Sequence, residues 1–380
     1  MHKEEIIEFL QKVVEKPDWK VREWKEQEKG KAVGFLLTDV PEELIHAAGF
    51  FPYGISGGRA RMEFADAHLQ SWTCSFVRSS LSLALEGKLD FLDGLIIPQT
   101  CDTTRNVSGI WQHANPLPFL QEYRLPRQVD RPSARNYLIY ELNRLKEELE
   151  KFSGRKITEE KIKESIALYN DNRNLLARLF VLHEQNPAAI SNRELYTIIE
   201  AALLMPVEIL NKYLNGLIEA LENEEAAPKS KIRLFISGTL LEPLEILDFI
   251  DENGGLVVGD DLKNGSRYID AQVQTNDDPL AALADRQLKR IPGAFYDPPH
   301  NPRRHFLVKT ARDKKVQGVI FLHLRNCEPE NYDFYDNMQA LEESGIPAIR
   351  IETEFVTAPS GQIRTRVEAF LEMIGGEGNV

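Results

Sequence analysis

The chain has 380 residues, which is more than one hydrophobic core usually holds, so we expect two or three domains. Lys and Arg number 46 against 59 Asp and Glu, and the net charge of −13 argues against a general role in binding nucleic acids or anionic membranes. The N-terminal segment has the pattern of a charged amphipathic helix rather than of a signal peptide. No run approaches the roughly 20 apolar residues that cross a bilayer. We therefore expect a cytoplasmic protein with no membrane or nucleic-acid partner.

The first part of the chain alternates between helix and strand patterns. In chain order, its elements are a charged helical segment over residues 1–30, a strand over 31–39, a helix over 41–49, an apolar run over 50–58 that ends in a Gly-rich turn, a helix that begins near Cys74 and a strand over 95–98. The helix over 41–49 has Pro41 in its first turn and Gly49 at its end, which are the positions that these residues prefer. This alternation indicates an α/β domain with a mostly parallel sheet.

Residues 134–227 have a helical pattern instead. Thr158, followed by two acidic residues, predicts a helix start, because the acids complement the helix dipole. Ser191 and Glu194 fit a capping box at a second start, and Pro206 should break or kink the helix that follows. The segment contains no cysteine, so we expect a helical insert without redox chemistry.

The α/β pattern resumes after a predicted linker over residues 226–231. Its elements cover residues 233–237, 244–255, 256–259, 318–324, 337–345 and 346–352, followed by a last helix over 361–374. The predicted fold class is therefore α/β, with two doubly wound parallel-sheet lobes and a helical insert between them. We place the N-terminal lobe at residues 1–133, the insert at 134–227 and the C-terminal lobe at 228–380.

The chain contains three cysteines, Cys74, Cys101 and Cys327. The apolar runs over 95–98 and 319–324 each end three residues before a cysteine. Ligands collect outside the carboxyl ends of the strands in an open parallel sheet, so thiols placed there indicate a shared site in the cleft between the lobes. An odd number of cysteines cannot close a disulfide framework in one chain. Three thiolates would instead suit a 4Fe–4S cluster with one iron open to substrate or solvent.

Three alternatives to a cluster remain open from the residues alone. Free cysteines are often buried packing residues without reactivity. A zinc ion would need a fourth ligand, for which His46, His68 and His323 are available by type, although His323 alternates within an apolar strand and is expected to be a core or sheet-face residue. A catalytic cysteine would need a histidine and an orienting carboxylate, which the sequence does not identify.

Two further motifs are weaker. The GISGG segment at Gly54–Gly58 matches the G-x-S-x-G pattern of a nucleophile elbow, but Pro52 interrupts the strand that this motif requires. A tight turn near a ligand is the better interpretation, because glycines permit close backbone approach. Asp260 and Asp261 follow an apolar run, where a functional loop and a solvated turn are about equally expected.

Charged residues near the cysteines have no assigned role. Arg78 and Arg105 each lie four residues after a candidate cysteine, and either would suit an anionic ligand or the protein surface. Asp102, Glu328 and His323 are also near in sequence, but closeness in sequence does not identify a proton donor. Neither a Walker A motif nor a G-x-G-x-x-G fingerprint is present, so any ATP must be bound by another polypeptide.

Several blocks of the chain together resemble one family. The N-terminal blocks are PEELIHAAGFFPYGISGG and CSFVRSSLSLALEGKLDFLDGLIIPQTCDTTRNVSGIW. The middle block is SGRKITEEKIKESIALYNDNR, and the C-terminal blocks are ISGTLLEPLEILDFIDENGGLVVGDDLKNGSRYID, GVIFLHLRNCEPENYDF and SGQIRTRVEAFLEMI. They cover nearly the whole chain and resemble subunits of the 2-hydroxyacyl-CoA dehydratase and benzoyl-CoA reductase family.

The resemblance implies a cofactor and partners. In that family three cysteines hold a 4Fe–4S cluster, so the implied ligands here are Cys74, Cys101 and Cys327. The resemblance also implies a heterodimer with a homologous second subunit, an acyl-CoA substrate and a separate ATP-dependent iron–sulfur activator that donates electrons. The implied function is that of an iron–sulfur subunit of an ATP-dependent radical enzyme, which adds one electron to a CoA thioester.

Two segments favour different branches of the family. CDTTRNVSGIW resembles the smaller, cluster-bearing subunit of benzoyl-CoA reductases, whereas VVGDDLKNGSRYID resembles the dehydratase pattern. We favour the reductase, an oxidoreductase that acts on an aromatic acyl-CoA, over an (R)-2-hydroxyacyl-CoA dehydratase, which is a lyase. An electron-relay subunit without its own substrate site is a further alternative. A scaffold protein that has lost the cluster is another, and the three intact cysteines argue against it.

Overall fold

The computed structural model describes residues 2–36, 38–58, 60–224, 231–274, 278–294, 296, 301–355 and 361–376. The strands of the first sheet are β1 (Ala32–Leu36), β2 (Phe51–Ile55), β3 (Gly94–Gln99) and β4 (Phe119–Arg124). Those of the second sheet are β5 (Ile232–Gly238), β6 (Gly255–Asp260), β7 (Gly318–Leu324) and β8 (Ala348–Thr353). The strand orders are β2-β1-β3-β4 and β6-β5-β7-β8, and all neighbouring strands are parallel.

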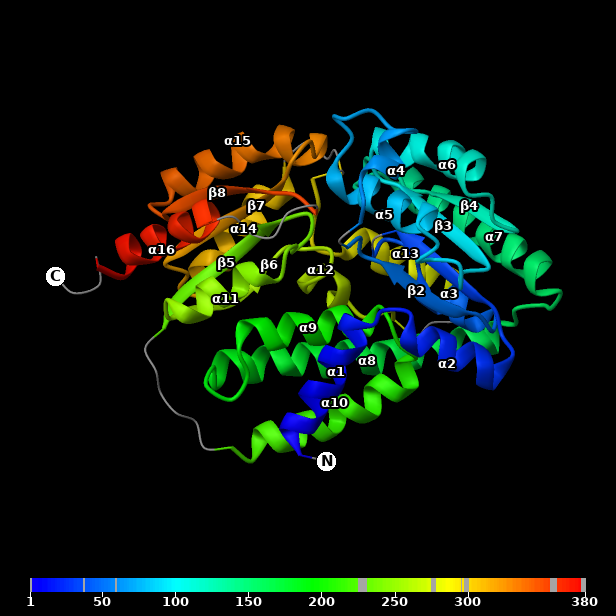
Figure 1. Cartoon of the computed structure of the whole chain (residues 1–380), viewed down its shortest axis with the longest axis horizontal. Coiled ribbons are helices and arrows are strands. Elements are labelled where there is room, and N and C mark those ends of the chain that lie inside the picture. Colours follow the sequence, from blue (N-terminus) through cyan, green and yellow to red (C-terminus); the bar gives the residue numbers. More distant parts are fainter. Residues whose placement is uncertain are drawn as a thin grey trace.

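Helices surround the two sheets. The helices of the first third are α1 (Lys3–Glu15), α2 (Trp19–Glu28), α3 (Glu42–Ala47), α4 (Glu63–Asp66), α5 (Ser75–Leu85) and α6 (Asp102–Ala114). The middle helices are α7 (Pro132–Ser153), α8 (Glu159–Gln185), α9 (Asn192–Ala202) and α10 (Val207–Glu222). The last third contains α11 (Glu245–Glu252), α12 (Ser266–Ile269), α13 (Pro279–Lys289), α14 (Pro302–Asp313), α15 (Glu328–Glu343) and α16 (Gly361–Gly376). Figure 1 shows the two sheets side by side, with α1, α8, α9 and α10 below them. The predicted α/β fold with two parallel-sheet lobes is confirmed.

The central strands are apolar because helices cover both faces of a parallel sheet. Every residue of β1 and β7 is buried. Pro52 lies inside β2 and does not interrupt it, contrary to the sequence-based expectation. Because β2 is an edge strand, the missing N–H of the proline breaks no interior ladder of the sheet.

The predicted helix starts in the middle segment are confirmed. The Thr158 hydroxyl accepts the N–H of Lys161 at the start of α8. Ser191 and Glu194 form a capping box at the start of α9. Pro206 directly precedes α10, so the chain forms two separate helices there. The predicted linker lies, apart from its last residue, outside the described residues.

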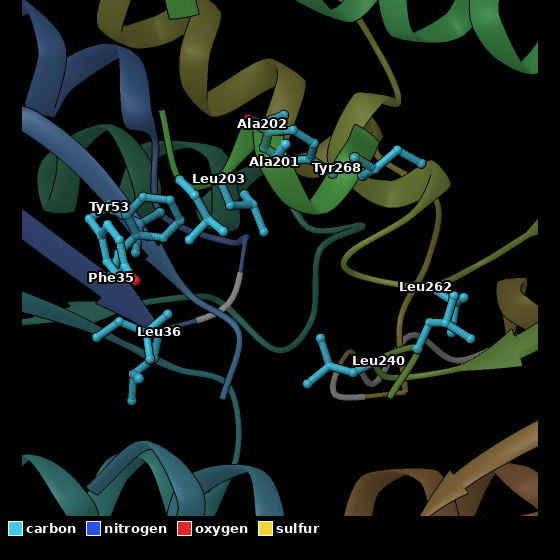
Figure 2. Packing of buried hydrophobic residues seen from close by; sticks show 14 of the residues in the cluster. Phe35, Leu36, Tyr53, Ala201, Ala202, Leu203, Leu240, Leu262 and Tyr268 are labelled. Atoms are coloured by element: carbon cyan, nitrogen blue, oxygen red, sulfur yellow. The ribbon is translucent and has the colours of Figure 1, made fainter. Parts of the chain in front are cut away.

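The middle helices and both lobes share a core. Helix α1 packs against α9 and α10, α3 against α8, and α13 against α7. Figure 2 shows Tyr53 of the first lobe near Leu203, which follows α9, and Leu240 and Leu262 of the second lobe across from them. The Gly54 N–H donates to the Leu203 carbonyl at 2.8 Å. The exact domain boundaries stay a prediction.

Within the described residues, no helix is both long enough and apolar enough to cross a bilayer.

Candidate functional site

Each cysteine is the residue immediately before a helix. Cys74 precedes α5, Cys101 precedes α6 and Cys327 precedes α15. Cys101 and Cys327 also follow β3 and β7, as predicted. In each sheet the strand order reverses next to these strands, between β1 and β3 and between β5 and β7. These two reversals are the points at which open α/β sheets bind ligands.

The first turn of each of these helices presents backbone N–H groups to a cysteine sulfur. The donors are Val77 and Phe76 for Cys74, Thr104 for Cys101, and Glu330 for Cys327. Such N–H groups, together with the positive end of the helix dipole, favour negative charge at the sulfur. The local structure therefore supplies part of the stabilisation that a thiolate needs at each of these positions.

The three thiols lie close enough to affect one another. Burial, followed by the charge of Cys327, raises the pKa of the Cys74 thiol well above its usual range. Burial and the charge of Glu330 raise the pKa of Cys327 to about 12. Cys101 contributes to both increases. The thiols of Cys74 and Cys327 are therefore protonated at neutral pH unless a cation replaces their protons.

The described residues give no direct support for a single-metal site. Among them, no group of three or more His, Cys, Asp or Glu side chains is arranged to hold a metal ion. His46 contacts Ser165 at 3.0 Å and Glu208 at 2.9 Å, in the layer of middle helices. His68 is exposed and His323 is buried within β7, as expected for a core residue. The zinc alternative gains no support from these positions.

Threonine hydroxyls lie next to two of the sulfur atoms. The Thr104 Oγ1 atom is 3.6 Å from the Cys101 sulfur, and the Thr239 Oγ1 atom is 3.6 Å from the Cys327 sulfur. The Thr239 hydroxyl also donates to a carboxylate oxygen of Glu330 at 2.9 Å. Thr104 is part of the helix that Cys101 begins, whereas Thr239 comes from the end of the neighbouring strand β5.

Of the two alternatives at Asp260 and Asp261, a functional loop and a solvated turn, the solvated turn is wrong. Both carboxylates are buried, and Asp260 accepts the Tyr196 hydroxyl at 2.7 Å. Asp261 accepts the Gly238 N–H at 2.9 Å and the Nε–H of Arg303 at 2.8 Å. Burial alone would raise the pKa of Asp261, but the charge of Arg303 lowers it below its usual value. Asp261 is therefore an ionised, structural carboxylate.

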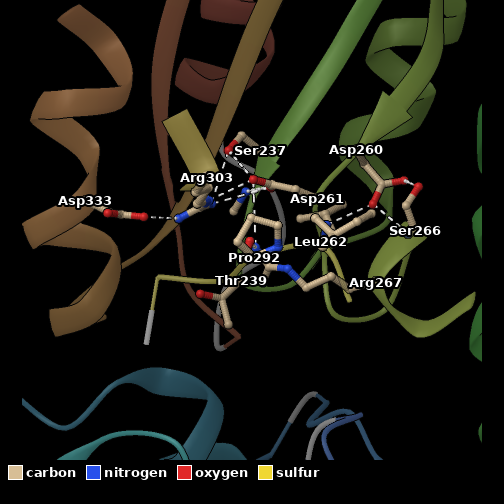
Figure 3. Close-up of polar contacts among 12 residues, drawn as sticks. Ser237, Thr239, Asp260, Asp261, Leu262, Ser266, Arg267, Pro292, Arg303 and Asp333 are labelled. Atoms are coloured by element: carbon tan, nitrogen blue, oxygen red, sulfur yellow. Dashed lines mark hydrogen bonds and ion pairs between the residues drawn. The ribbon is translucent and has the colours of Figure 1, made fainter. Parts of the chain in front are cut away.

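Arg303 connects this carboxylate to the helix that begins at Cys327. Its guanidinium donates to Glu330 at 2.8 Å. It also donates to Asp333 at 3.2 Å and to Asp261, as Figure 3 shows. The sequence reasoning did not identify Arg303, Glu330 or Thr239. Thr239 had a usable signal, because it follows a predicted strand at its carboxyl end, and Glu330 lies three residues after Cys327.

A second buried ion pair joins the two lobes. Asp39, which follows β1, forms an ion pair with Lys263, which follows β6, and both side chains are at most 3% exposed. Arg290 lies 3.7 Å from Asp39, and the Thr38 hydroxyl donates to the Lys263 carbonyl at 2.7 Å. The charge of Cys101 acts on the pKa of Lys263, so this pair lies close to the cysteines.

A cavity of about 560 Å³ lies beside Cys101. Its lining includes Asp102, Arg105, Arg127, Tyr296, Glu328 and Tyr332, from both lobes. The volume falls in the usual range for small-molecule sites. Of the charged residues considered from the sequence, Arg105, Asp102 and Glu328 thus share one cavity.

Two other sequence candidates have ordinary partners. Arg78 pairs with Asp66, with its Nε–H donating at 3.0 Å. The Ser56 hydroxyl of the GISGG segment donates to Glu200, and the next helix begins only at Glu63. A nucleophile elbow needs a helix immediately after the serine, so the hydrolase interpretation stays rejected.

Comparisons with known proteins agree over nearly the whole chain. The family model described as 2-hydroxyglutaryl-CoA dehydratase, D-component, matches residues 37–374. The chain is 31% identical to a benzoyl-CoA reductase subunit of Thauera aromatica, over 93% of each chain. It is 30% identical to the beta subunit of (R)-2-hydroxyglutaryl-CoA dehydratase of Acidaminococcus fermentans, over 97% of this chain and 99% of that one. It is 28% identical to the (R)-phenyllactyl-CoA dehydratase beta subunit of Clostridium sporogenes, over 95% of this chain and 96% of that one.

Proposed function

Because the chain belongs to the 2-hydroxyglutaryl-CoA dehydratase D-component family, we propose that it is the iron–sulfur subunit of an enzyme that adds one electron to a CoA thioester. Relatives in this family are subunits of benzoyl-CoA reductases and 2-hydroxyacyl-CoA dehydratases, and the chain is an enzyme subunit of this kind. Its position in the cytoplasm stays a prediction.

We infer that Cys74, Cys101 and Cys327 hold a 4Fe–4S cluster. The observation that carries this proposal is that all three thiols begin helices, two of them shortly after the third strand of a sheet, and receive backbone N–H groups from the first turn. A cluster holds its thiolates farther apart than a single ion does, so the lack of a single-ion site among the described residues does not conflict with it. Cysteine thiolates are the donors by which proteins hold 4Fe–4S clusters, and this supports the proposal.

The chemistry that such a cluster supplies is transfer of single electrons at low potential, tuned by charge, hydrogen bonds and solvent exposure. The chain's own residues contribute the surroundings. Helices α5, α6 and α15 direct their N-termini at the anionic sulfurs, which stabilises negative charge there. The adjoining cavity has room for an acyl group and includes Arg105, Tyr296 and Glu328 from both lobes.

The favoured branch is the benzoyl-CoA reductase type, with an aromatic acyl-CoA as substrate. The 31% identity to the Thauera aromatica protein supports it. The (R)-2-hydroxyacyl-CoA dehydratase alternative is supported by a nearly equal identity of 30% over 97% of the chain. In either case we propose a homologous second subunit and an ATP-dependent iron–sulfur activator as partners. An electron-relay role without a substrate site in this chain is the third alternative.

Analysis of anaerobically purified protein tests the cofactor. We expect one oxygen-sensitive 4Fe–4S cluster per chain, and loss of iron and sulfide in Cys74→Ala, Cys101→Ala or Cys327→Ala. Ser80→Ala is a matched control, because the Ser80 hydroxyl donates to a carbonyl of its own helix at 2.9 Å. Zinc in place of iron, or an unchanged spectrum in Cys327→Ala, would contradict the assignment.

Turnover assays distinguish the benzoyl-CoA reductase alternative from the 2-hydroxyacyl-CoA dehydratase alternative. The reconstituted complex, with its partner and electron donor, should be given benzoyl-CoA and an (R)-2-hydroxyacyl-CoA in parallel. Reduction of the ring of benzoyl-CoA supports the reductase, and loss of water from the hydroxyacyl thioester supports the dehydratase.

A further inference from the structure

Thr239 is held in a fixed position above the end of β7. It follows Gly238, the last residue of β5, and a Cβ atom at Gly238 would collide with the backbone oxygen of Leu322. Only a glycine allows the two strands to approach this closely. The Lys263 N–H donates to the Thr239 carbonyl at 2.9 Å, which fixes the following backbone. These backbone contacts therefore hold the Thr239 side chain next to Cys327.

The Thr239 hydroxyl has two acceptors and one proton. Its oxygen lies 3.6 Å from the Cys327 sulfur and 2.9 Å from a carboxylate oxygen of Glu330. With Cys327 as a neutral thiol, the S–H group can donate to the threonine oxygen while the hydroxyl donates to Glu330. A metal-bound sulfur carries no proton, so it becomes a second acceptor for the hydroxyl.

The Glu330 carboxylate can lose the hydrogen bond from the Thr239 hydroxyl because it has another strong partner. Glu330 is 4% exposed and accepts the Nη1–H of Arg303 at 2.8 Å. That charge-assisted bond is stronger than a bond from a neutral hydroxyl. When the hydroxyl turns from the Oε1 atom of Glu330 to the sulfur, the Oε2 atom keeps its bond to Arg303, so the buried carboxylate stays paired with a cation.

The corresponding threonine beside Cys101 cannot serve the same way. The Thr104 hydroxyl donates to the Cys101 carbonyl at 3.1 Å. Its oxygen also accepts the N–H groups of Thr100 and Cys101, each at 3.1 Å. The Thr104 hydroxyl thus holds the backbone around its cysteine, whereas the Thr239 hydroxyl is able to donate a hydrogen bond to a sulfur.

We propose that the Thr239 hydroxyl donates a hydrogen bond to the metal-bound sulfur of Cys327 and so raises the reduction potential of the centre. Hydrogen bonds to cluster sulfurs are a principal means by which proteins set this potential, because they stabilise the more negative, reduced state. Thr239 is a positioning and tuning residue rather than a catalytic one. The inference rests on the proposed function, since it requires a cluster at the three cysteines.

Redox titration of the purified protein, followed by electron paramagnetic resonance, tests the proposal. Thr239→Val keeps the shape of the side chain and removes its hydroxyl, so we expect full iron and sulfide content with a more negative midpoint potential. Thr239→Ala should shift the potential in the same direction, and Thr239→Ser should restore the wild-type value. Thr353→Val is the matched control, because the Thr353 hydroxyl is buried in β8 and has no hydrogen-bond partner among the described residues. It should leave the potential unchanged.

The outcomes separate the two levels of the proposal. An unchanged potential in Thr239→Val and Thr239→Ala, at full iron content, would overturn the role of Thr239 and leave the cluster assignment standing. An equal shift in Thr239→Ser would also overturn it, since the hydroxyl would then not be the cause. Absence of iron and sulfide from the wild-type protein would contradict the proposed function, and this inference with it.

Discussion

The neighbouring side chains Glu42 and Glu43 of α3 are both buried, yet their pKa values move in opposite directions. Burial and the negative charge of Glu43 raise the pKa of Glu42 to about 8. Burial acts on Glu43 as well, but the charges of Arg173 and Arg286 outweigh it and lower the pKa of Glu43. Glu43 forms an ion pair with Arg173, and Glu42 lies near the Tyr268 hydroxyl at 3.2 Å. One carboxyl of the pair is therefore neutral at pH 7 and the other is ionised.

The raised pKa of Glu42 predicts a loss of stability as the pH rises from mildly acidic to mildly alkaline values. Its ordinary pKa of 4.5 applies to the unfolded chain and about 8 to the folded one. Its contribution to the free energy of unfolding is therefore fully present below about pH 4.5, decreases as the pH rises from there, and is lost once the pH has passed 8. We expect the thermal unfolding midpoint of the wild type to fall between about pH 5 and 8, and that of Glu42→Gln to fall less. Glu372→Gln, at an exposed position, should behave like the wild type. Equal pH profiles for all three proteins would show that Glu42 does not titrate there.

The buried guanidinium of Arg303 predicts a large loss of stability on its removal. Arg303→Met would leave the Glu330 carboxylate buried without its cation, and Asp261 with only the more distant Arg267, at 3.8 Å. Removing one partner of such a network usually costs about 3–5 kcal/mol. Arg178→Met is a suitable control, because Arg178 pairs with Glu222 at a site where both side chains are over 40% exposed, and such pairs contribute about 1 kcal/mol or less. Urea unfolding of both variants would measure the difference in their free energies of unfolding. Similar losses in the two variants would mean that Arg303 does not stabilise the buried carboxylates.

The close contact between β5 and β7 predicts that Gly238 cannot be replaced. In Gly238→Ala, the new methyl group would meet the Leu322 carbonyl oxygen, and the strands would have to separate. We expect a destabilisation of about 1–3 kcal/mol. Gly109 in α6 has open space around it, so Gly109→Ala should instead stabilise the helix by about 0.5–1 kcal/mol. Denaturant unfolding would distinguish the two, and a neutral Gly238→Ala would mean that the strands have room to move.

Features set by neighbouring residues could be predicted from the sequence, and features set by distant ones could not. The starts of α8 and α9 follow from Thr158 and Ser191, whose hydrogen bonds reach only three residues ahead. The positions of Cys101 and Cys327 after strands were also predictable from apolar runs. By contrast, the buried Asp261 carboxylate pairs with Arg303, which lies 42 residues away in the chain, so its surroundings depend on the completed fold.

The compatibility of β2 with a proline also depends on distant parts of the chain. Pro52 is compatible with a strand only because β2 lies at the edge of its sheet, and strand order is a property of the whole lobe. Thr239 was missed because it meets Cys327 across two strands that are 88 residues apart in the chain at this point. The three thiols could be proposed as a site from the sequence, whereas the contact of Thr239 with Cys327 could not, because it depends on which strands are neighbours.

The two lobes have the same strand order, although no repeat is evident in the sequence. In each lobe the second strand lies at one edge, followed by the first, third and fourth. Cys101 and Cys327 therefore occupy equivalent places, each after the third strand of its sheet. The buried pair of Asp39 and Lys263 joins the lobes near these places. A site shared by the two lobes is thus supported by the architecture as well as by the cysteines.

This shared site predicts an obligate assembly. The similar proteins are named as subunits, so we expect a heterodimer with a homologous chain and an interface above about 2,000 Å² in total. Analytical ultracentrifugation of the co-expressed chains should show a stable one-to-one complex, while this chain alone should not turn over acyl-CoA. A monomer that reduces acyl-CoA with a chemical reductant would contradict this expectation.

The sequence also predicts how the energy for the reaction is supplied. Adding an electron to a thioester requires a very low potential, yet the chain has neither a Walker A motif nor a dinucleotide-binding fingerprint. We therefore expect negligible ATP binding by this protein, and activity only when a separate ATP-dependent iron–sulfur donor is added. Calorimetry with ATP on the purified chain, beside assays with and without the donor, would measure both. Tight ATP binding by this chain would overturn the division of roles between the chain and its donor. Sustained turnover without any nucleotide would count against the whole assignment as a radical reductase, because an ordinary donor would then supply electrons of sufficient energy.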